Sequence, residues 1–331
     1  MTPPAAPRPP APVLLGDAEV RARLTPATAT AAVRHALLEH QAGRLAAPPR
    51  WHAGLGGGEL VFTVGALAAE GAQGVAAVHG EAGVHREAGV HGFRAYGTAD
   101  RAGEQLVAVW DSASGRLTAV VHGQELGPRR TGAIGAVAVE ALARTGGPAG
   151  CRLGLIGTGP QGWAQLWALS ASASHRPAEV AVFGRRRERA ERFAARVREE
   201  LGLAARAVDS ARAAVQGREV VIVATNSPTP VLEADWVAPG THLSTLGPKS
   251  TTHYEIPPEL AERAAVIATD SPAQAGSYGT DHLLGPTPLT ALGAVLAGTA
   301  PGRRGHDDIT LFSSVGLAGT EVAVAAALTR A

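Results

Sequence analysis

The segment from Arg152 to Arg187 constrains the fold more than any other part of the chain. It contains a hydrophobic run LGLI, a glycine-rich turn GTGPQG from Gly157 to Gly162, a helical stretch, a second hydrophobic run VAVF, and then GRRR. A strand, a glycine turn, a helix and a second strand in this order form the βαβ unit of a parallel sheet. The segment therefore predicts an α/β fold with a Rossmann-type, doubly wound parallel sheet.

Each position of the GTGPQG turn suits the binding of a dinucleotide. Gly157 permits a tight turn out of the strand, Gly159 lets the backbone approach a pyrophosphate, and Gly162 lets the next helix pack closely on the sheet. Free N–H groups and the helix dipole favour an anion at the start of that helix. We expect the cofactor to contact Gly157, Thr158, Gly159, Pro160, Gln161 and Gly162. The alternative is a glycine turn without a ligand, because one such motif alone is a weak signal.

The residues after the second hydrophobic run bear on the choice between NAD and NADP. A protein that prefers NAD usually has an acidic residue there, which binds the ribose hydroxyls. This chain has Gly184 instead, followed by Arg185, Arg186 and Arg187. Two or three guanidinium groups could bind a 2′-phosphate, and no carboxylate is present to repel it. The sequence therefore favours NADP(H) over NAD, with Gly184, Arg185 and Arg186 at the cofactor.

Composition limits the classes of protein to which the chain can belong. With 331 residues, 45% of them hydrophobic, the chain is long enough for two domains. Its 30 basic and 29 acidic residues offer no cationic surface for nucleic acid. Cys151 is the only cysteine, so no internal disulfide is expected and a reducing compartment, the cytoplasm, is favoured. No apolar run is long enough to span a membrane, and the N-terminus lacks the apolar core of a signal peptide.

Hydrophobic patterning gives the order of the remaining elements. Helical spacing runs from Ala27 to His40, and the short apolar runs LVFTV, VAAV, LVAVW and LTAVV between Leu60 and Val121 predict an antiparallel sheet. The segment TGAIGAVAVEALAR predicts a helix that leads into the nucleotide strand. Further strands are expected at EVVIVAT, HLSTLG and AAVIATD, and GLAGTEVAVAAALTR predicts a last helix. We predict a disordered tail over 1–12, a mainly antiparallel α+β domain over 13–128 plus 305–331, and an inserted Rossmann domain over 129–304.

A short repeat places His79, His85 and His91 six residues apart, in VHGEAG, VHREAG and VHGFRA. Residues six apart share one face of an extended strand, so a metal-binding row is conceivable. Histidines so spaced along one strand lie too far apart to share an ion. We therefore favour a duplicated loop beside the active-site mouth and expect no metal.

Five segments resemble the ornithine cyclodeaminase and mu-crystallin family in the order of its motifs. They are RRTGAIGAVAVEALA, LGLIGTGPQGWAQ, VIVATNSPTPVL, GTHLSTLG and DDITLFSSVGLA, and the similarity covers nearly the whole chain after the tail. The resemblance implies a homodimer whose first domain, completed by the C-terminal helix, forms the dimer interface. It also implies a small-molecule substrate held between that domain and the nicotinamide.

The resemblance assigns roles residue by residue. Arg50 in PPR and Arg130 in RRT match two arginines that bind the substrate carboxylate, a task that suits a planar guanidinium; the alternative is a pair of surface salt bridges. The other matches lie at the cofactor or close the site: Thr131 near the phosphates, Thr225 and Asn226 in the loop after the fourth strand, Leu246 and Gly247 under the nicotinamide, and Ser314, Val315 and Gly316 in the closing segment.

Two departures from the family pattern bear on the reaction. Family members that act on amino acids have a lysine in a Gly-hydrophobic-Lys pattern, and the matching residues here are Gly74, Val75 and Ala76. The family's catalytic aspartate, two residues after the glycine that matches Gly247, is replaced by Lys249, the only lysine of the chain. A partly desolvated lysine can donate a proton near neutral pH, so we expect a catalytic role for Lys249 beside Arg130. The alternative is an exposed loop residue.

These departures favour one reaction class. Cyclodeamination of ornithine depends on both missing groups, whereas hydride delivery to an iminium needs mainly a positioned cofactor and a site closed to solvent. We therefore predict an NADPH-dependent reductase of a C=N bond, acting on a cyclic imine or dehydro amino acid. An amino acid dehydrogenase, an ornithine cyclodeaminase-type enzyme and a non-catalytic NADPH-binding protein similar to mu-crystallin remain as alternatives.

Overall fold

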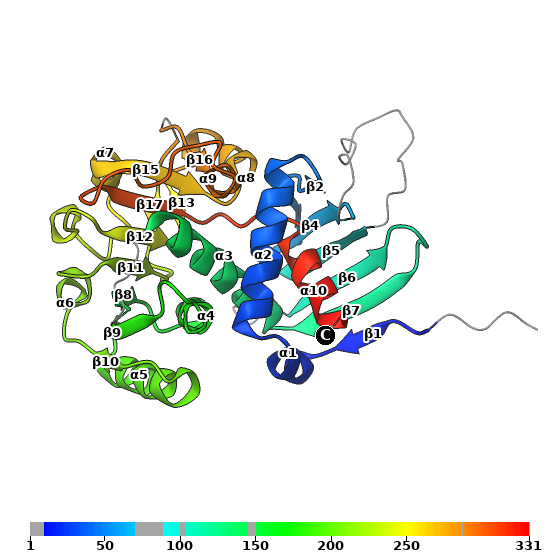
Figure 1. The fold of residues 1–331 in the computed structure, drawn as a ribbon, viewed down its shortest axis with the longest axis horizontal. Helices are drawn as coiled ribbons and strands as arrows, with labels where there is room; N and C mark the ends of the chain where they lie inside the picture. Colours follow the sequence, from blue (N-terminus) through cyan, green and yellow to red (C-terminus); the bar gives the residue numbers. More distant parts are fainter. Residues whose placement is uncertain (1–9, 70–88, 100–103, 145–149, 286, 331) are drawn as a thin grey trace, which may run out of the picture.

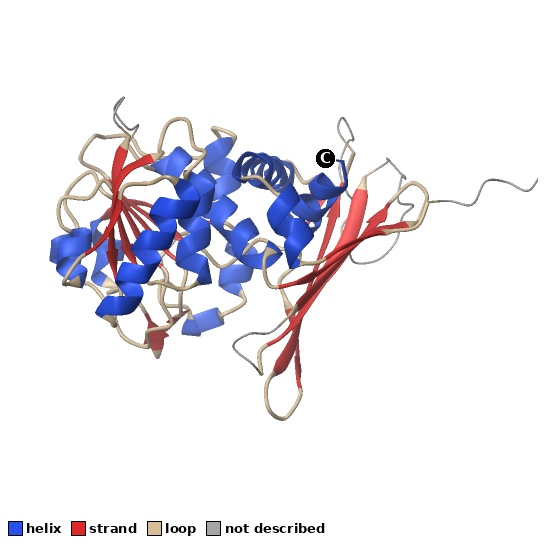
Figure 2. Ribbon diagram, turned by 90° about the horizontal axis from the view of Figure 1, so that it is seen from below, coloured by secondary structure: helices blue, strands red, loops and turns tan. Residues whose placement is uncertain are grey.

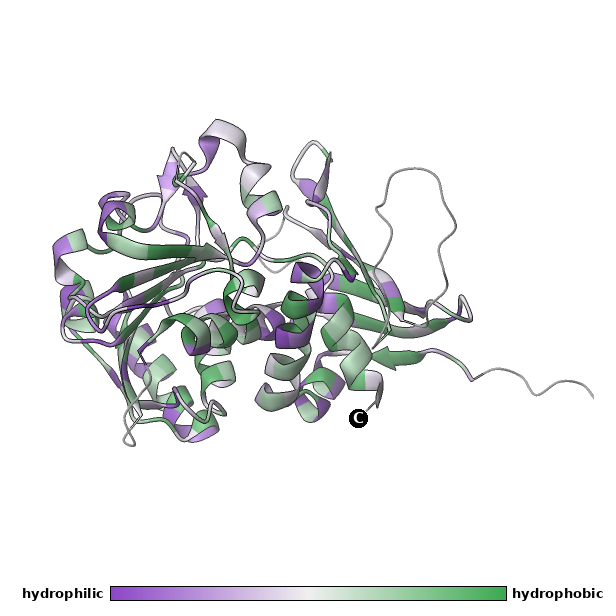
Figure 3. Cartoon of the chain, turned by 45° about the horizontal axis from the view of Figure 1, so that its top comes forward, coloured by the Kyte–Doolittle hydropathy of each residue, from purple (hydrophilic) through white to green (hydrophobic). Residues whose placement is uncertain are grey.

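The computed structural model describes residues 10–69, 89–99, 104–144, 150–285 and 287–330, which form two large β-sheets with helices packed between them (Figure 1). The expected tail residues 1–9 and most of the histidine repeat lie outside these ranges. The strands of both sheets are mostly hydrophobic, as Figure 3 shows. Across the described ranges, no helix is both long and apolar enough to cross a membrane.

The second half of the chain forms a parallel sheet with the strand order β10-β9-β8-β11-β12-β17-β15-β16. The chain passes from β8 to β9 on one side and later reaches β11 on the other, so the strand order reverses beside β8. Ligands of such sheets bind next to the carboxyl ends of the strands at this reversal. The strands are β8 (Cys151–Ile156), β9 (Pro177–Phe183), β10 (Ala205–Ala207), β11 (Val220–Val223), β12 (His242–Thr245), β15 (Ala264–Thr269), β16 (Thr290–Ala291) and β17 (Ile309–Ser313).

Short helices and one small hairpin connect these strands. They are α4 (Pro160–Leu169), α5 (Arg187–Leu201), α6 (Ala211–Val215), η1 (Ala234–Trp236), α7 (Glu259–Arg263), α8 (Pro272–Gly276), η2 (Gly279–Asp281) and α9 (Leu292–Leu296), with β13 (Lys249–Ser250) paired to β14 (His253–Tyr254). Strand β11 is buried along its whole length, as a strand covered on both faces must be.

The first half forms a mainly antiparallel sheet with the order β1-β7-β6-β5-β4-β2, in which β3 also pairs with β4 and β1 runs parallel to β7. Helices α1 (Asp17–Arg23), α2 (Pro26–Gln41) and α10 (Thr320–Arg330) lie on one side of this sheet, and Figure 2 shows its other face without a covering helix. The strands are β1 (Val13–Leu15), β2 (Leu45–Ala46), β3 (Trp51–Gly54), β4 (Glu59–Leu67), β5 (Val90–Gly97), β6 (Gln105–Asp111) and β7 (Leu117–Gly123).

Helix α3 (Leu126–Leu142) joins the two parts of the molecule, since it contacts α4 of the Rossmann sheet as well as α2 and α10. Its approach to α4 depends on small residues. A Cβ at Gly132 would collide with the carbonyl oxygen of Ala164, and a Cβ at Gly135 would collide with the side chain of Gln165. The glycines of the segment TGAIGAVAVEA therefore bring Arg130, at the start of α3, close to the nucleotide-binding half.

The predicted fold class, a Rossmann sheet inserted in a mainly antiparallel α+β domain, is confirmed. One boundary differs, because residues 309–313 form β17, which pairs with β12 and β15 in the parallel sheet. The chain therefore leaves that sheet after Ser313 and not at residue 305. The last helix also begins later than expected, at Thr320, because Gly316 and Gly319 have left-handed φ angles of 84° and 81°. The expected strand VAAV lies outside the described residues.

Candidate active site

The glycine turn lies at the carboxyl end of β8, beside the reversal of strand order. Gly157 has a φ of 119°, and a Cβ there would collide with the carbonyl oxygen of Ala224, which follows β11. A Cβ at Gly162 would lie 2.7 Å from the carbonyl oxygen of Gly157. The position of a Cβ at Gly159, by contrast, has no heavy atom of the described residues within 4 Å, apart from the residues that adjoin it in the chain. Gly157 and Gly162 are thus required by packing, and Gly159 leaves open space in front of the turn.

The start of α4 faces this open space without a side-chain cap. Gly159 is the N-cap residue and Pro160 is the first helical residue. In the described part of the chain, no side chain caps this helix start. The Oε1 atom of Gln161 is buried and has no hydrogen-bond partner among the described residues. Uncapped N–H groups at a helix start bind anions. The turn therefore fits the pyrophosphate of a dinucleotide, which the six residues expected from the sequence would hold.

The basic residues after β9 lie next to this turn. A Cβ at Gly184 would lie 2.9 Å from Cγ2 of Thr158, so the two loops are in contact. Arg187 is paired with Glu191 and Asp209. Arg185 and Arg186 are exposed and make no ion pair with a described residue. These two arginines, rather than all three, are therefore available for a ligand phosphate.

Glu255 organises the loops that follow β11 and β12. Its carboxylate is fully buried and accepts hydrogen bonds from the backbone and hydroxyl of Thr225, the hydroxyl of Thr245, and the N–H groups of Leu246 and Gly247, at 2.5 to 2.9 Å. The carboxylate thus fixes three residues that the sequence places at the cofactor. Asn226, the fourth residue expected there, is exposed.

Lys249 lies on β13, directly after this loop, and only 7% of the residue is exposed. Its Nζ donates a hydrogen bond of 2.6 Å to the carbonyl oxygen of Gly247. Burial lowers the pKa of Lys249 to about 8; the carboxylates of Glu255 and Asp270 oppose this effect, and Arg50 adds to it. A lysine with this pKa is able to donate a proton near neutral pH. The alternative of an exposed loop residue is therefore wrong.

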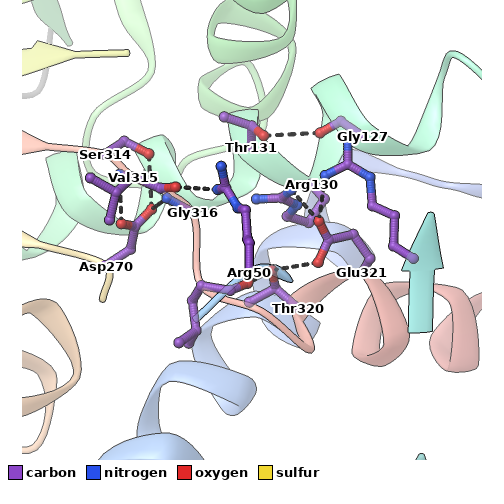
Figure 4. A network of polar contacts seen from close by, with 12 residues as sticks. Arg50, Gly127, Arg130, Thr131, Asp270, Ser314, Val315, Gly316, Thr320 and Glu321 are labelled. Carbon is purple, nitrogen blue, oxygen red and sulfur yellow. Dashed lines mark hydrogen bonds and ion pairs between the residues drawn. The ribbon is translucent and has the colours of Figure 1, made fainter. Parts of the chain in front are cut away.

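Asp270 fixes the segment that closes the site. It follows β15 and accepts bonds of 2.8 Å from the hydroxyl of Ser314 and from the N–H groups of Val315 and Gly316, as Figure 4 shows. These contacts hold the chain where it leaves β17. They also place the carbonyl oxygen of Val315 so that it accepts a hydrogen bond from Nη2 of Arg50.

Arg50, in the loop directly before β3, and Arg130 of α3 converge on Gly316 (Figure 4). A Cβ at Gly316 would lie 3.3 Å from Nη1 of Arg130 and would collide with Nη2 of Arg50. The backbone N–H of Arg50 is anchored to the Gln274 side chain at 2.9 Å. Arg130 is buried and paired with Glu321 of α10, so the alternative of two surface salt bridges does not apply to it.

Thr131 lies one residue after Arg130, but its hydroxyl donates a bond of 3.0 Å to the carbonyl oxygen of Gly127 within α3. Its own carbonyl oxygen accepts a bond of 3.2 Å from Gln165 of α4. Thr131 therefore ties α3 to the nucleotide-binding helix. A direct contact between this hydroxyl and a phosphate stays a prediction.

The sequence left four buried site residues unassigned: Glu255, Asp270, Gln274 and Glu321. A signal existed for Asp270, since it directly follows a predicted parallel strand at its carboxyl end. Of the histidine repeat, only His91 is described; it stacks on Trp110 and bonds to Ser112 at 3.0 Å. Among the described residues, no three His, Cys, Asp or Glu side chains are placed to hold a metal ion.

Comparison with known proteins identifies the family that the chain resembles. The family model for the ornithine cyclodeaminase/mu-crystallin family matches residues 12–329. The "Ketimine reductase mu-crystallin" of Mus musculus is 32% identical over 222 residues, 67% of each chain. The "Iminosuccinate reductase" of Paracoccus denitrificans (strain Pd 1222) is 33% identical over 231 residues, 68% of this chain and 69% of that relative.

A solved structure extends the likeness to the whole fold. A probable ornithine cyclodeaminase from Bordetella pertussis Tohama I has a TM-score of 0.82 and 24% identity, with 97% of this chain and 96% of that chain covered. The sequence relatives named above are reductases of C=N bonds, and their alignments span about two thirds of each chain. Because the family model covers nearly the full length, the chain belongs to the ornithine cyclodeaminase/mu-crystallin family.

Proposed function

We propose that this protein is an NADPH-dependent reductase of a C=N bond in a substrate that also bears a carboxylate. The observation that carries the proposal is the convergence of Arg50 and Arg130 on Gly316, with the buried Lys249 close enough to Arg50 for that charge to help lower the lysine pKa. Two guanidinium groups suit a carboxylate, and a lysine with a pKa of about 8 suits proton donation.

The proposed roles of the residues follow from their chemistry. A bound nicotinamide would supply the hydride that the imine carbon accepts. Arg50 and Arg130 would hold the substrate carboxylate, and the ammonium of Lys249 would give one proton to the imine nitrogen. The C=N bond then becomes a C–N single bond, with one hydrogen added at each atom. The neutral Lys249 regains its proton from solvent.

The preference for NADPH over NADH is also part of the proposal. It rests on Arg185 and Arg186, which are exposed next to the glycine turn and have no carboxylate partner among the described residues. A reductase consumes reduced cofactor, which agrees with a preference for NADPH. A cytoplasmic location is also part of this proposal. The names of the two sequence relatives, ketimine reductase and iminosuccinate reductase, support the reaction class for this chain.

We further propose a homodimer formed through the uncovered face of the antiparallel sheet. Val64 and Leu106 are exposed large apolar residues, and a groove of about 370 Å³ beside Val64 is lined by Ala66, Phe93 and Trp110, among others. A contiguous apolar surface of this kind usually marks an interface. An antiparallel sheet can leave one face to solvent, so the apolar side chains on this face are what favours a partner there. A second copy of the chain fits the family.

The test is NADPH oxidation by the purified protein with a panel of imines. A five- or six-membered cyclic imine that carries a carboxylate next to the C=N carbon should be reduced, and NADH should serve less well. Amino acids with oxidised cofactor should react slowly at neutral pH. Conversion of ornithine to proline without net use of cofactor, or tight NADPH binding without any turnover, would contradict the proposal and favour a cyclodeaminase or a non-catalytic protein.

A further inference from the structure

Lys249 lies in the middle of a small ladder of three chain segments. Its strand, β13, pairs with β14 on one side. On the other side, the N–H of Leu283 donates a bond of 2.6 Å to the carbonyl oxygen of Lys249, and Ser250 forms an antiparallel bridge with His282. The backbone of Lys249 is therefore held from both sides, which gives its amine a defined position in the site.

The buried ammonium of Lys249 has no ion pair among the described residues. Its Nζ makes one hydrogen bond there, to the carbonyl oxygen of Gly247. The carboxylate of Glu255 accepts five hydrogen bonds from the loops after β11 and β12, and Asp270 accepts three from the segment that closes the site. Burial and the charge of Lys249 lower the pKa of His282, so this neighbour is neutral at pH 7.

A lysine in this setting is a nucleophile as well as an acid. With a pKa of about 8, about 9% of Lys249 is neutral amine at pH 7, against about 0.03% of a lysine with the usual value of 10.5. The neutral amine gives one N–H to Gly247 and keeps its lone pair free, because no described residue donates a hydrogen bond to Nζ. Desolvated lysines with a lowered pKa form Schiff bases with carbonyl substrates.

We propose that Lys249 binds a 2-oxo acid as a covalent iminium and passes it to an amine, so that the protein makes the C=N bond that it reduces. The neutral amine of Lys249 attacks the ketone carbon. The ketone oxygen leaves as water, with one proton from the lysine nitrogen and one from solvent. The carboxylate of the oxo acid lies on Arg50 and Arg130, as in the proposed function.

Transfer to the second substrate regenerates the lysine. An amine attacks the iminium carbon, gives one proton to the lysine nitrogen and expels neutral Lys249 as the new C=N bond forms. The carbon of this imine is separated from Nζ by the imine nitrogen, whereas the carbon of the lysyl iminium is bonded to Nζ itself. A nicotinamide placed to reduce the first is therefore misplaced for the second. The hydride step rests on the proposed function, and the covalent step does not.

The first test is to trap the iminium of the purified protein with cyanoborohydride at pH 7. The probe is 2-oxobutanoate, with butanone as the matched ketone without a carboxylate, and peptide mass spectrometry locates the adduct. Lys249 is the only lysine, so the variant Arg192→Lys, at a side chain that is 74% exposed, supplies an ordinary lysine for comparison. From the fractions of neutral amine we expect 2-oxobutanoate to label Lys249 roughly 100- to 300-fold faster than the introduced lysine.

The ketone without a carboxylate should label Lys249 more slowly than 2-oxobutanoate does, and the introduced lysine should show less preference. Labelling of Lys249 at or below the rate of the introduced lysine would overturn the proposal. Neither measurement changes Lys249, so both are independent of whether variants at this position fold.

The second test uses Lys249→Arg, which keeps the positive charge without a nucleophilic amine. With 2-oxobutanoate, methylamine and NADPH, this variant should lose at least about tenfold more activity than it loses with a preformed cyclic imine carboxylate. Equal losses would overturn the transfer step. Normal reduction of preformed imines without any adduct at Lys249 would refute this inference and leave the proposed function intact. An adduct at Lys249 without reduction of any imine would support the covalent step and refute the proposed function.

Discussion

Replacement of Lys249 by methionine should stabilise the protein at neutral pH, by an amount that depends on pH. Burial lowers the pKa of Lys249 from 10.5 to about 8, so the folded state holds its proton less tightly than the unfolded chain does. Because one pKa unit corresponds to about 1.36 kcal/mol, keeping Lys249 protonated in the fold at pH 7 costs about 3 kcal/mol. The unfolded state binds more protons between pH 8 and pH 10.5, so wild-type stability should rise with pH there.

The variant lacks this titration. At pH 9.5 the folded lysine is mostly neutral, and the remaining cost is about 1.4 kcal/mol. The difference in unfolding free energy between Lys249→Met and wild type should therefore shrink by about 2 kcal/mol from pH 7 to pH 9.5. The loss of the bond to Gly247 and any change in packing add an offset that does not depend on pH.

Urea unfolding at a fixed protein concentration measures this difference. Lys249 is the only lysine, so no other ammonium side chain titrates in this range. Arg152→Met, which removes an exposed cation, is the control and should give a difference independent of pH. A Lys249→Met difference that is also the same at both pH values would refute the lowered pKa.

The remaining predictions concern catalysis, the cofactor and assembly. If protonated Lys249 donates the proton, kcat/KM should fall as pH rises through about 8, and Lys249→Met should be slow and lack this decline. Arg185→Ala should weaken NADPH binding roughly 10-fold and leave NADH binding nearly unchanged, as fluorescence titration would measure; an equal loss for both would exclude a phosphate contact. In Gly157→Ala the free energy of unfolding should fall by roughly 1–3 kcal/mol, because alanine is strained at a φ of 119°. NADPH should no longer raise the Tm of this variant. Val64→Asp should yield monomers in light scattering, and unchanged dimers would place the interface elsewhere.

The local pattern of the sequence predicted the nucleotide-binding half well. The GTGPQG turn, the flanking strands and the exposed Arg185 and Arg186 depend on residues that are near one another in the chain. The same is true of Lys249. It stands two residues after Gly247, where the family pattern has an aspartate, so the substitution can be read from the aligned sequence. Burial of its side chain is a tertiary property, which the structure adds.

The rest of the site depends on contacts between distant segments. Glu321 is an acid in an alanine-rich helix, and only the packing of α10 on β5 and α3 brings it to Arg94 and Arg130. Glu255 likewise acts through loops that are separated from it by up to 30 residues. The misplaced boundary at residue 305 has a similar cause, because β17 inserts between β12 and β15 out of sequence order.

The most direct test of the central claim is the transfer of deuterium from NADPH that carries deuterium at both C4 positions of the nicotinamide. Incubated with a cyclic imine carboxylate and the purified protein, the labelled cofactor should yield a cyclic amino acid with one deuterium on the carbon that bears the carboxylate. One NADPH should be consumed per product, as mass spectrometry and absorbance would measure together. Product without deuterium, or product formed without consumption of NADPH, would contradict the account.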